Sequence, residues 1–217
     1  MKLTKLFTIT LLALSCSYAT ANSQTTTDLP QNTQLVKAGG KYITLLGQQV
    51  SVGDKAPNFK VVNDAFTPVN LSDYSNKILL ISAVPSLDTG VCSLQTKRFN
   101  EEIIKFSKDI QVLTLSNDLP FAQKRFCKTE KIDNVTVLSD SVWRDFGTKY
   151  GLLIKDMGLL TRAIFIIDGT GKIAYKELVE ELSSHPDYDT ALATLKALSS
   201  NNANETPAEQ GQKLVNN

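Results

Sequence analysis

The chain has little of the material from which most catalytic and metal sites are built. Its 217 residues include one histidine, His185, and three cysteines, and no two cysteines form a Cys-x-x-Cys pair. The sequence therefore lacks the residues for a histidine-assisted catalytic triad or a zinc site, and the usual dithiol redox motif is absent. His185 precedes Pro186 at an expected helix start, where a surface position is the simpler interpretation. No glycine-rich phosphate loop is present, and we expect no cofactor and no metal.

An excess of charge of one sign is also missing. The sequence has 23 basic and 22 acidic side chains, a formal net charge of +1. Such a balance argues against a nucleic acid or an anionic membrane held by bulk electrostatics. Internal repeats and linkers are absent as well, so we expect one α/β domain over residues 37–198. A polar, flexible lead-in over 22–36 and a disordered tail over 199–217 are predicted to flank it.

The N-terminal end has the pattern of a secretory signal peptide over residues 1–21. Lys2 and Lys5 precede a short apolar run, and a small-x-small site ends at Ala21. The run is too short to span a bilayer as a stable helix, so we expect cleavage before Asn22, export to the bacterial periplasm and no stable membrane insertion afterwards.

Lipidation at Cys16 is the alternative processing. It fits poorly, because bulky Leu14 stands where a lipoprotein signal usually has a small residue. An exported domain lies in an oxidising setting, in which two remaining cysteines often form a structural disulfide.

The pattern of apolar residues predicts a three-layer α/β fold with a mixed central sheet. Ile78–Val84 is a continuous apolar run, which is typical of a strand covered on both faces. Strands alternate with helices after it, and a hairpin and a helix end the domain. The other expected strands are 42–46 and 49–52, paired in an N-terminal hairpin around Gly47-Gln48, and 110–115, 135–138, 163–167 and 172–179. The expected helices run from the cysteine loop to about 108, over 120–128, over 140–150 and from 186.

Cys92 is the first candidate for chemistry, because it follows the buried strand and falls in the first turn of the next helix. Unpaired amides and the positive end of the helix dipole favour an anion there. One face of the predicted helix carries Cys92, Phe99, Ile103 and Phe106. Cys92 is therefore expected at the solvent-exposed end of an otherwise buried apolar face, where it is partly shielded. Thr89 supplies a hydroxyl three residues earlier, and a glycine at 90 allows a close approach or a sharp turn.

A reactive Cys92 needs a cation in addition to the helix. Holding a thiol as thiolate near neutral pH takes about 3.4 kcal/mol, whereas a helix terminus contributes about 2 kcal/mol at best. Arg162 is the candidate, because its strand, if antiparallel to Ile78–Val84, begins where the cysteine loop departs. A strand-end arginine paired with a carboxylate is the alternative. The other arginines fit less well: Arg98 lies off the helix face that carries Cys92, Arg125 lies opposite Cys127, and Arg144 is expected to be solvated.

Cys127 ends a short predicted helix, 35 positions after Cys92. It is either a resolving partner for an oxidised Cys92 or half of a static disulfide, and the residues alone leave both open.

From about Lys41 to Leu198 the chain resembles the thiol peroxidases, which are atypical two-cysteine peroxiredoxins with a thioredoxin-like fold. The resemblance rests on Pro-Ser-x-Asp-Thr-x-Val-Cys at 85–92 and on Asp-Leu-Pro-Phe-Ala-Gln-x-Arg-Phe-Cys at 118–127. Arg162 before a buried strand and Pro-Asp-Tyr at 186–188 also fit. The leader and the polar C-terminal tail depart from the usual compact members.

The resemblance implies a thiol peroxidase that reduces hydrogen peroxide and organic hydroperoxides. Cys92 would be the peroxidatic nucleophile and Cys127 the resolving cysteine, joined in an intramolecular disulfide that a thioredoxin-like dithiol protein reduces. Arg162 would stabilise the thiolate and the leaving oxygen, Thr89 would hydrogen-bond thiolate and peroxide, and Pro85 would shield the pocket. A homodimer is also expected.

Two other functions stay open at this point. A thiol–disulfide oxidoreductase would act on other proteins without peroxide, although the missing Cys-x-x-Cys counts against it. An exported, non-enzymatic domain with a static disulfide would show no turnover, and Cys92→Ser would lower its stability by about 2–4 kcal/mol.

Overall fold

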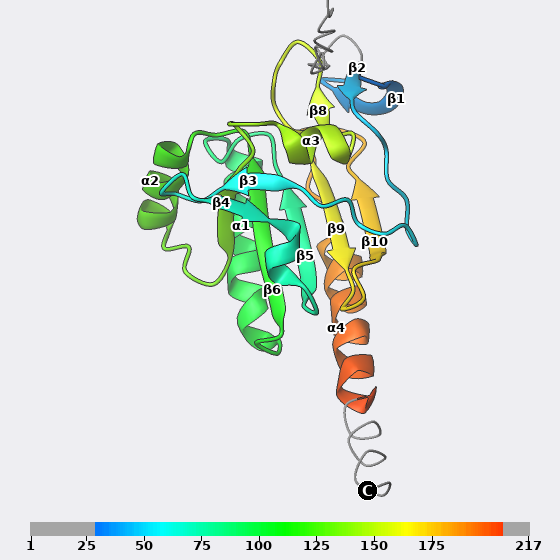
Figure 1. Cartoon of the computed structure of the whole chain (residues 1–217). Coiled ribbons are helices and arrows are strands. Elements are labelled where there is room, and N and C mark those ends of the chain that lie inside the picture. The colour runs from blue at the N-terminus through cyan, green and yellow to red at the C-terminus, as the bar shows by residue number, and fades with distance from the viewer. Residues whose placement is uncertain (1–28, 206–217) are drawn as a thin grey trace, which may run out of the picture.

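The structure is a computed structural model that describes residues 29–205 (Figure 1). The predicted signal peptide, Cys16, the first part of the predicted lead-in (22–28) and the end of the predicted tail (206–217) lie outside the described residues. None of the helices between residues 29 and 205 is long and apolar enough to cross a membrane.

A seven-stranded mixed sheet forms the centre of the fold, as predicted. Three of its strands are parallel and the pairs at both edges are antiparallel. In spatial order the strands are β10 (Ile173–Leu178), β9 (Ala163–Ile167), β5 (Ile78–Ala83), β6 (Ile110–Ser116), β7 (Thr136–Ser139), β3 (Lys60–Val62) and β4 (Pro68–Asn70).

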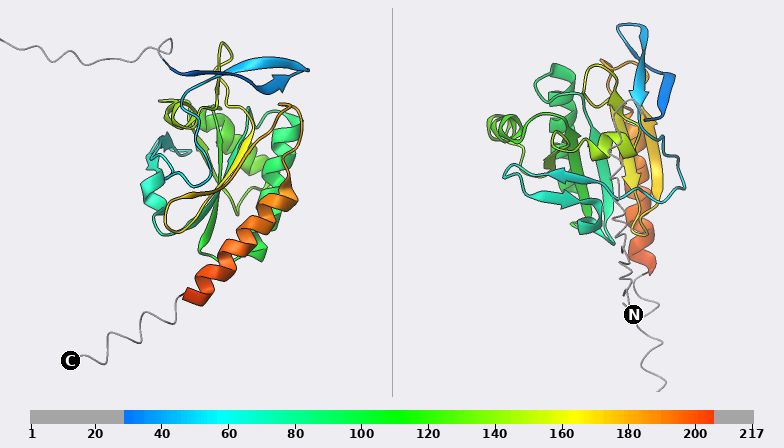
Figure 2. Two further views of the ribbon diagram at one scale, coloured as in Figure 1. Left: turned by 90° about the vertical axis from the view of Figure 1, so that its right-hand side faces the viewer. Right: turned by 45° about the horizontal axis from the view of Figure 1, so that its top comes forward.

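Helices cover both faces of this sheet and give the predicted three layers (Figure 2). Alternate residues of β5 supply the two cores, because successive side chains of a strand point to opposite faces. Ile78 and Leu80 pack with α1, α2 and α4, whereas Leu79 and Ile81 pack with α3. The helices are α1 (Gly90–Glu102), α2 (Pro120–Glu130), α3 (Asp145–Lys149) and α4 (Tyr188–Glu205), with short 3-10 turns η2 (Leu71–Tyr74) and η3 (Ile103–Lys105).

An N-terminal hairpin is present, but it pairs other residues than predicted, and residues 49–52 form no strand. It consists of β1 (Gln31–Ala38) and β2 (Lys41–Leu46), and with β8 (Leu153–Ile154) it forms a separate antiparallel sheet. The turn is Gly39-Gly40, with φ of 58° and 77°, and not Gly47-Gln48. Residues 31–36, predicted to be flexible, are therefore strand. Their polar side chains give no alternating pattern, and Val36 alone among them is fully buried.

Several helix boundaries also differ from the prediction. The helix expected over 140–150 is only α3, because Arg144 has φ of 53° and interrupts it. Asp140 still caps α3, since its carboxylate accepts bonds from the amides of Phe146 and Gly147. Arg144, expected to be solvated, is half-buried and donates to Gly158 O. α1 and η3 end at 105 and not 108, and α2 ends at 130 and not 128. α4 begins at 188 and not 186, and it continues to 205 into the predicted tail.

Candidate active site around Cys92

Strand pairing brings the cysteine loop and Arg162 to the same end of the sheet. β5 and β9 are antiparallel, with Ala83 opposite Ala163. The chain that leaves β5 therefore passes beside the residue that precedes β9. α1 begins at Gly90 after the N-cap residue Thr89, so Cys92 is its third residue. Its amide is one of those with no acceptor inside the helix.

Arg162 reaches the sulfur of Cys92 directly. Its Nη2 lies 3.4 Å from Cys92 Sγ, and its side chain is buried, with 2% of its surface exposed. Nη1 donates to Gln95 Oε1 at 2.7 Å. Nε and Nη2 both donate to the carbonyl oxygen of Leu182, at 3.2 and 3.1 Å.

The charge of this guanidinium is not neutralised by a carboxylate within residues 29–205. Its acceptors there are an amide oxygen, a carbonyl oxygen and the sulfur, and none of the ion pairs in that range includes Arg162. A guanidinium has five N–H groups, so one on Nη1 has no partner among these residues. The site therefore keeps a positive charge and a free donor next to a thiol.

Cys92 is more deeply buried than its predicted position at the solvent-exposed end of an apolar helix face. None of its surface is exposed. It packs with Val84 and Leu87, and Phe126 of α2 and Val137 of β7 lie against the same cluster. The first turn of α1 is covered by its own loop and by α2, which the helical periodicity of α1 does not reveal.

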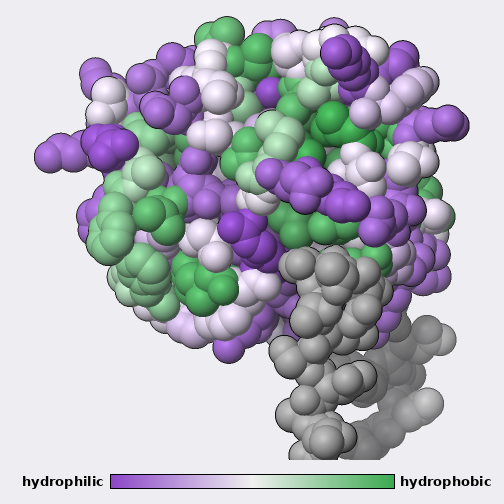
Figure 3. Space-filling model, turned by 90° about the horizontal axis from the view of Figure 1, so that it is seen from above, coloured by the Kyte–Doolittle hydropathy of each residue, from purple (hydrophilic) through white to green (hydrophobic). Residues whose placement is uncertain are grey.

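A pocket of about 430 Å³ opens at this end of the molecule, which Figure 3 views from above. Pro85, Thr89 and Arg162 line it together, and Cys92 is not part of the lining. The Thr89 hydroxyl donates to Ser86 O at 2.9 Å. Gly90 also lines the pocket, and a Cβ there would meet no atom within 4 Å. The other lining residues are Ala38, Gly39, Val91, Leu159, Glu181, Leu182 and Ser183.

Cys127 lies on α2, half-buried, and both it and Cys92 are free thiols. Burial, followed by the Asp64 carboxylate, raises the pKa of Cys127, so this thiol stays protonated at neutral pH. Cys127 packs against the core under α1 and α4, whereas Phe126 contacts both that core and the Cys92 cluster. The structure thus brings α2 to the Cys92 cluster through Phe126 and turns Cys127 toward the other core.

Two residues that hold this site together were not predicted. Gln95 joins Arg162 to Ser82, since its Nε2 donates to Ser82 Oγ at 2.7 Å. Its position three residues after Cys92 places it beside Cys92 on the helix, a signal that was available. Asp118 accepts bonds from Ser86 Oγ and Leu87 N, both at 2.7 Å, and ties the cysteine loop to the start of α2. No pattern in the sequence marks that long-range contact.

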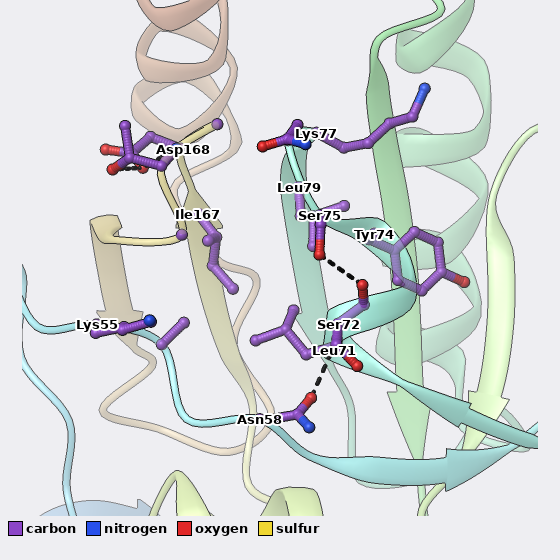
Figure 4. A pocket seen from close by; sticks show the side chains of 15 residues that line it. Lys55, Asn58, Leu71, Ser72, Tyr74, Ser75, Lys77, Leu79, Ile167 and Asp168 are labelled. Atoms are coloured by element: carbon purple, nitrogen blue, oxygen red, sulfur yellow. Dashed lines mark hydrogen bonds between the residues drawn. The ribbon is translucent and has the colours of Figure 1, made fainter.

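A second pocket, of about 400 Å³, lies at the opposite end of β5 and β9 (Figure 4). Its polar groups bond to one another: Ser72 N donates to Asn58 Oδ1, and Ser75 Oγ donates to Ser72 O. None of the five residues proposed from the sequence lines it. Within residues 29–205 no group of three His, Cys, Asp or Glu side chains could hold a metal ion. The first pocket is therefore the candidate active site.

Comparisons with known proteins give a consistent result. The Redoxin family matches residues 51–192. The thiol peroxidase of Oceanobacillus iheyensis is 50% identical over 153 residues, 70% of this chain and 93% of that protein. The thiol peroxidase of Bacillus subtilis is 46% identical over 159 residues, 73% of this chain and 95% of that protein. The crystal structure of a peroxiredoxin-like protein from Aquifex aeolicus has a TM-score of 0.71 and 43% identity, and the match covers 76% of this chain and 98% of that one.

Proposed function

Because this chain belongs to the Redoxin family and is a thiol-dependent peroxidase with a thioredoxin-like fold, we propose that Cys92 is the sulfur that a hydroperoxide oxidises. The observation that carries the proposal is the 3.4 Å contact between Arg162 Nη2 and Cys92 Sγ. A buried guanidinium without a carboxylate partner places an uncompensated positive charge beside this sulfur, and the thiolate is the nucleophilic form of a cysteine.

In the first step the Cys92 thiolate attacks one oxygen of the hydroperoxide. The S–O bond forms as the O–O bond breaks, so the sulfur becomes a sulfenic acid and the other oxygen leaves as water or an alcohol after taking up a proton. Arg162 stabilises the charge that develops on the leaving oxygen, for which its free N–H is available. Pro85 keeps water from the pocket, and Thr89, whose hydroxyl proton is donated to Ser86 O, positions the peroxide by accepting from its O–H.

In the second step the Cys127 thiol attacks the sulfenic sulfur. Water leaves, and a Cys92–Cys127 disulfide forms. A disulfide needs Cα atoms within about 7 Å and Cβ atoms that face one another. Because Phe126 stands against the Cys92 cluster while Cys127 faces the other core, the first turn of α1 or the α2 helix unwinds locally to bring the sulfurs together.

A thioredoxin-like dithiol protein then reduces the disulfide by thiol–disulfide exchange and is itself oxidised. With the predicted signal peptide, the site of action is the periplasm and the donor is a dithiol protein of that compartment. Hydrogen peroxide and organic hydroperoxides are the substrates, and the enzyme acts as a homodimer. The alternative of a non-enzymatic domain with a static disulfide is not favoured, since it gives no reason for an unneutralised buried arginine beside Cys92.

Stopped-flow oxidation of the pre-reduced protein tests the proposal. A Cys16→Ser background leaves two thiols, so that thiol counts refer to Cys92 and Cys127 alone. We expect fast reaction with hydrogen peroxide in this background, no turnover in Cys92→Ser, and a sulfenic acid that accumulates and over-oxidises in Cys127→Ser. A parent protein that reacts no faster than a small thiol, or equal turnover in Cys92→Ser, would show that the assignment is wrong.

A further inference from the structure

The orientation of Arg162 depends on one carbonyl group outside the helix and the strand that carry the site. Leu182 O accepts from both Nε and Nη2 of Arg162, at 3.2 and 3.1 Å. The same Nη2 reaches Cys92 Sγ. A shift of this carbonyl would therefore turn the guanidinium relative to the sulfur.

Leu182 belongs to the segment between β10 and α4, and the N-terminal hairpin holds that segment in place. Leu182 N donates to Lys37 O at 2.8 Å, and Lys37 N donates to Glu180 O at 2.6 Å. The Leu182 side chain packs against the small core of Val36, Leu45 and Ile154. The hairpin is thus linked to Arg162 through a single residue, Leu182, whose N–H bonds to the hairpin and whose carbonyl bonds to the guanidinium.

Glu181 ties the tip of the hairpin to this segment. Its two carboxylate oxygens accept one bond each from the amides of Gly39 and Gly40, both at 3.1 Å. Both glycines have positive φ, which suits a tight hairpin turn and directs the two amides to one carboxylate. The Gly40 amide in particular lowers the pKa of Glu181, so the carboxylate is charged at neutral pH.

The same contact forms one wall of the pocket. Gly39 and Glu181 line it together with Arg162 (Figures 1 and 2 place the hairpin at the end where β5 stops and β9 starts). Loss of the contact would therefore change both the wall and the carbonyl that orients the guanidinium.

We propose that the β1–β2 hairpin holds Arg162 in its reactive orientation and that Glu181 is the positioning residue that keeps the hairpin in place. The inference rests on the proposed role of Arg162 in peroxide reduction. Glu181 acts through the chain Gly39–Gly40, Lys37 and Leu182.

The test compares Glu181→Ala with Glu180→Ala in the full chain with the Cys16→Ser background. Glu180 is the matched control, because it is the neighbouring carboxylate and bears the same charge. Its side chain pairs with Lys37 Nζ at the surface, where ion pairs contribute little. The readouts are the rate constant for Cys92 oxidation by hydrogen peroxide and the pH midpoint of that rate.

We expect Glu181→Ala to slow Cys92 oxidation about tenfold and to move the pH midpoint upward, since a displaced guanidinium stabilises the thiolate and the leaving oxygen less. Glu180→Ala is expected to stay within about twofold of the parent. Glu181→Gln, which retains one acceptor oxygen, should recover part of the rate. It also carries the test if Glu181→Ala proves unfolded by circular dichroism.

Equal rates and midpoints in the Glu181 and Glu180 variants would overturn the inference, whether both are fast or both are slow. A parent protein without fast oxidation would instead overturn the proposed function itself, so the two failures are distinguishable.

Discussion

At the scale of single residues, Gln95 shows how a neutral side chain can serve a charged site. Its amide oxygen accepts from Arg162, and its amide nitrogen donates to Ser82, with both neighbours buried. A carboxylate in its place would hold the arginine equally well and would also neutralise it. The amide accepts a hydrogen bond from the guanidinium without neutralising it, so the positive charge can act on the Cys92 sulfur.

Gln95→Met is expected to slow Cys92 oxidation by about tenfold and to destabilise the fold by about 1–3 kcal/mol, because a buried Arg162 N–H loses its acceptor. Peroxide stopped-flow and urea unfolding measure the two effects. Leu94→Ala, at the exposed neighbouring position, is the control and should change neither. An unaltered oxidation rate in Gln95→Met would show that Leu182 O alone orients the arginine.

At the scale of elements, Asp118 connects the cysteine loop to α2, the two segments that carry the cysteines of the proposed disulfide. Ser86 Oγ, Leu87 N and Ser116 Oγ all donate to its carboxylate, at 2.7, 2.7 and 2.8 Å. These bonds stabilise the reduced, packed arrangement. The same bonds therefore oppose the local unwinding in the second step.

Asp118→Ala is expected to speed disulfide formation from the sulfenic acid severalfold and to reduce over-oxidation at high peroxide, at a cost of about 1–3 kcal/mol in stability. Quenched-flow trapping with mass spectrometry resolves the sulfenic, sulfinic and disulfide species. Asp88→Ala, at an exposed aspartate of the same loop, should leave the partition between these species unchanged. Slower disulfide formation in Asp118→Ala would mean that the contact assists the rearrangement.

The elements also show what sequence patterns can and cannot predict. β9 follows its predicted bounds, and β5 comes within one residue of them, because continuous apolar runs are specific to strands covered on both faces. β1 was missed, since its pairing rests on backbone bonds and its outer residues are polar. Arg162 could be placed beside Cys92 from the expected strand direction. Glu181 and Leu182 could not. Glu181 contacts Gly39 and Gly40, which lie more than 140 residues earlier in the chain, and Leu182 contacts Arg162, which lies 20 residues earlier. Such contacts depend on the folded topology.

At the scale of the whole molecule, a buried carboxyl makes stability depend on pH. Burial raises the pKa of Asp140 to about 7, against the amides of Gly147 and Phe146, which lower it. An aspartate in the unfolded chain has a pKa of about 3.9. Between these two values the unfolded chain loses the proton and the folded protein keeps it, so stability falls as pH rises, and it levels off above about pH 7.

From pH 5 to pH 8 this group is expected to lower the free energy of unfolding by about 3 kcal/mol. Asp140→Asn should remove that part of the decline, measured by urea unfolding at both pH values. Asp145→Asn, at the start of the same helix and paired with Lys149 at the surface, should retain most of the decline, since the Asp145 charge ranks below burial among the causes that raise the pKa of Asp140. The same slope in Asp140→Asn and the parent would show that Asp140 is ionised throughout this range.

The complete burial of Cys92 would separate the two half-reactions of the proposed cycle in space. A molecule as small as hydrogen peroxide needs only a narrow opening beside Arg162, whereas a protein that donates electrons is too large to touch the Cys92 sulfur. On the proposed cycle, reducing equivalents would enter through α2 and its half-buried Cys127. Oxidant and donor would then use different entrances.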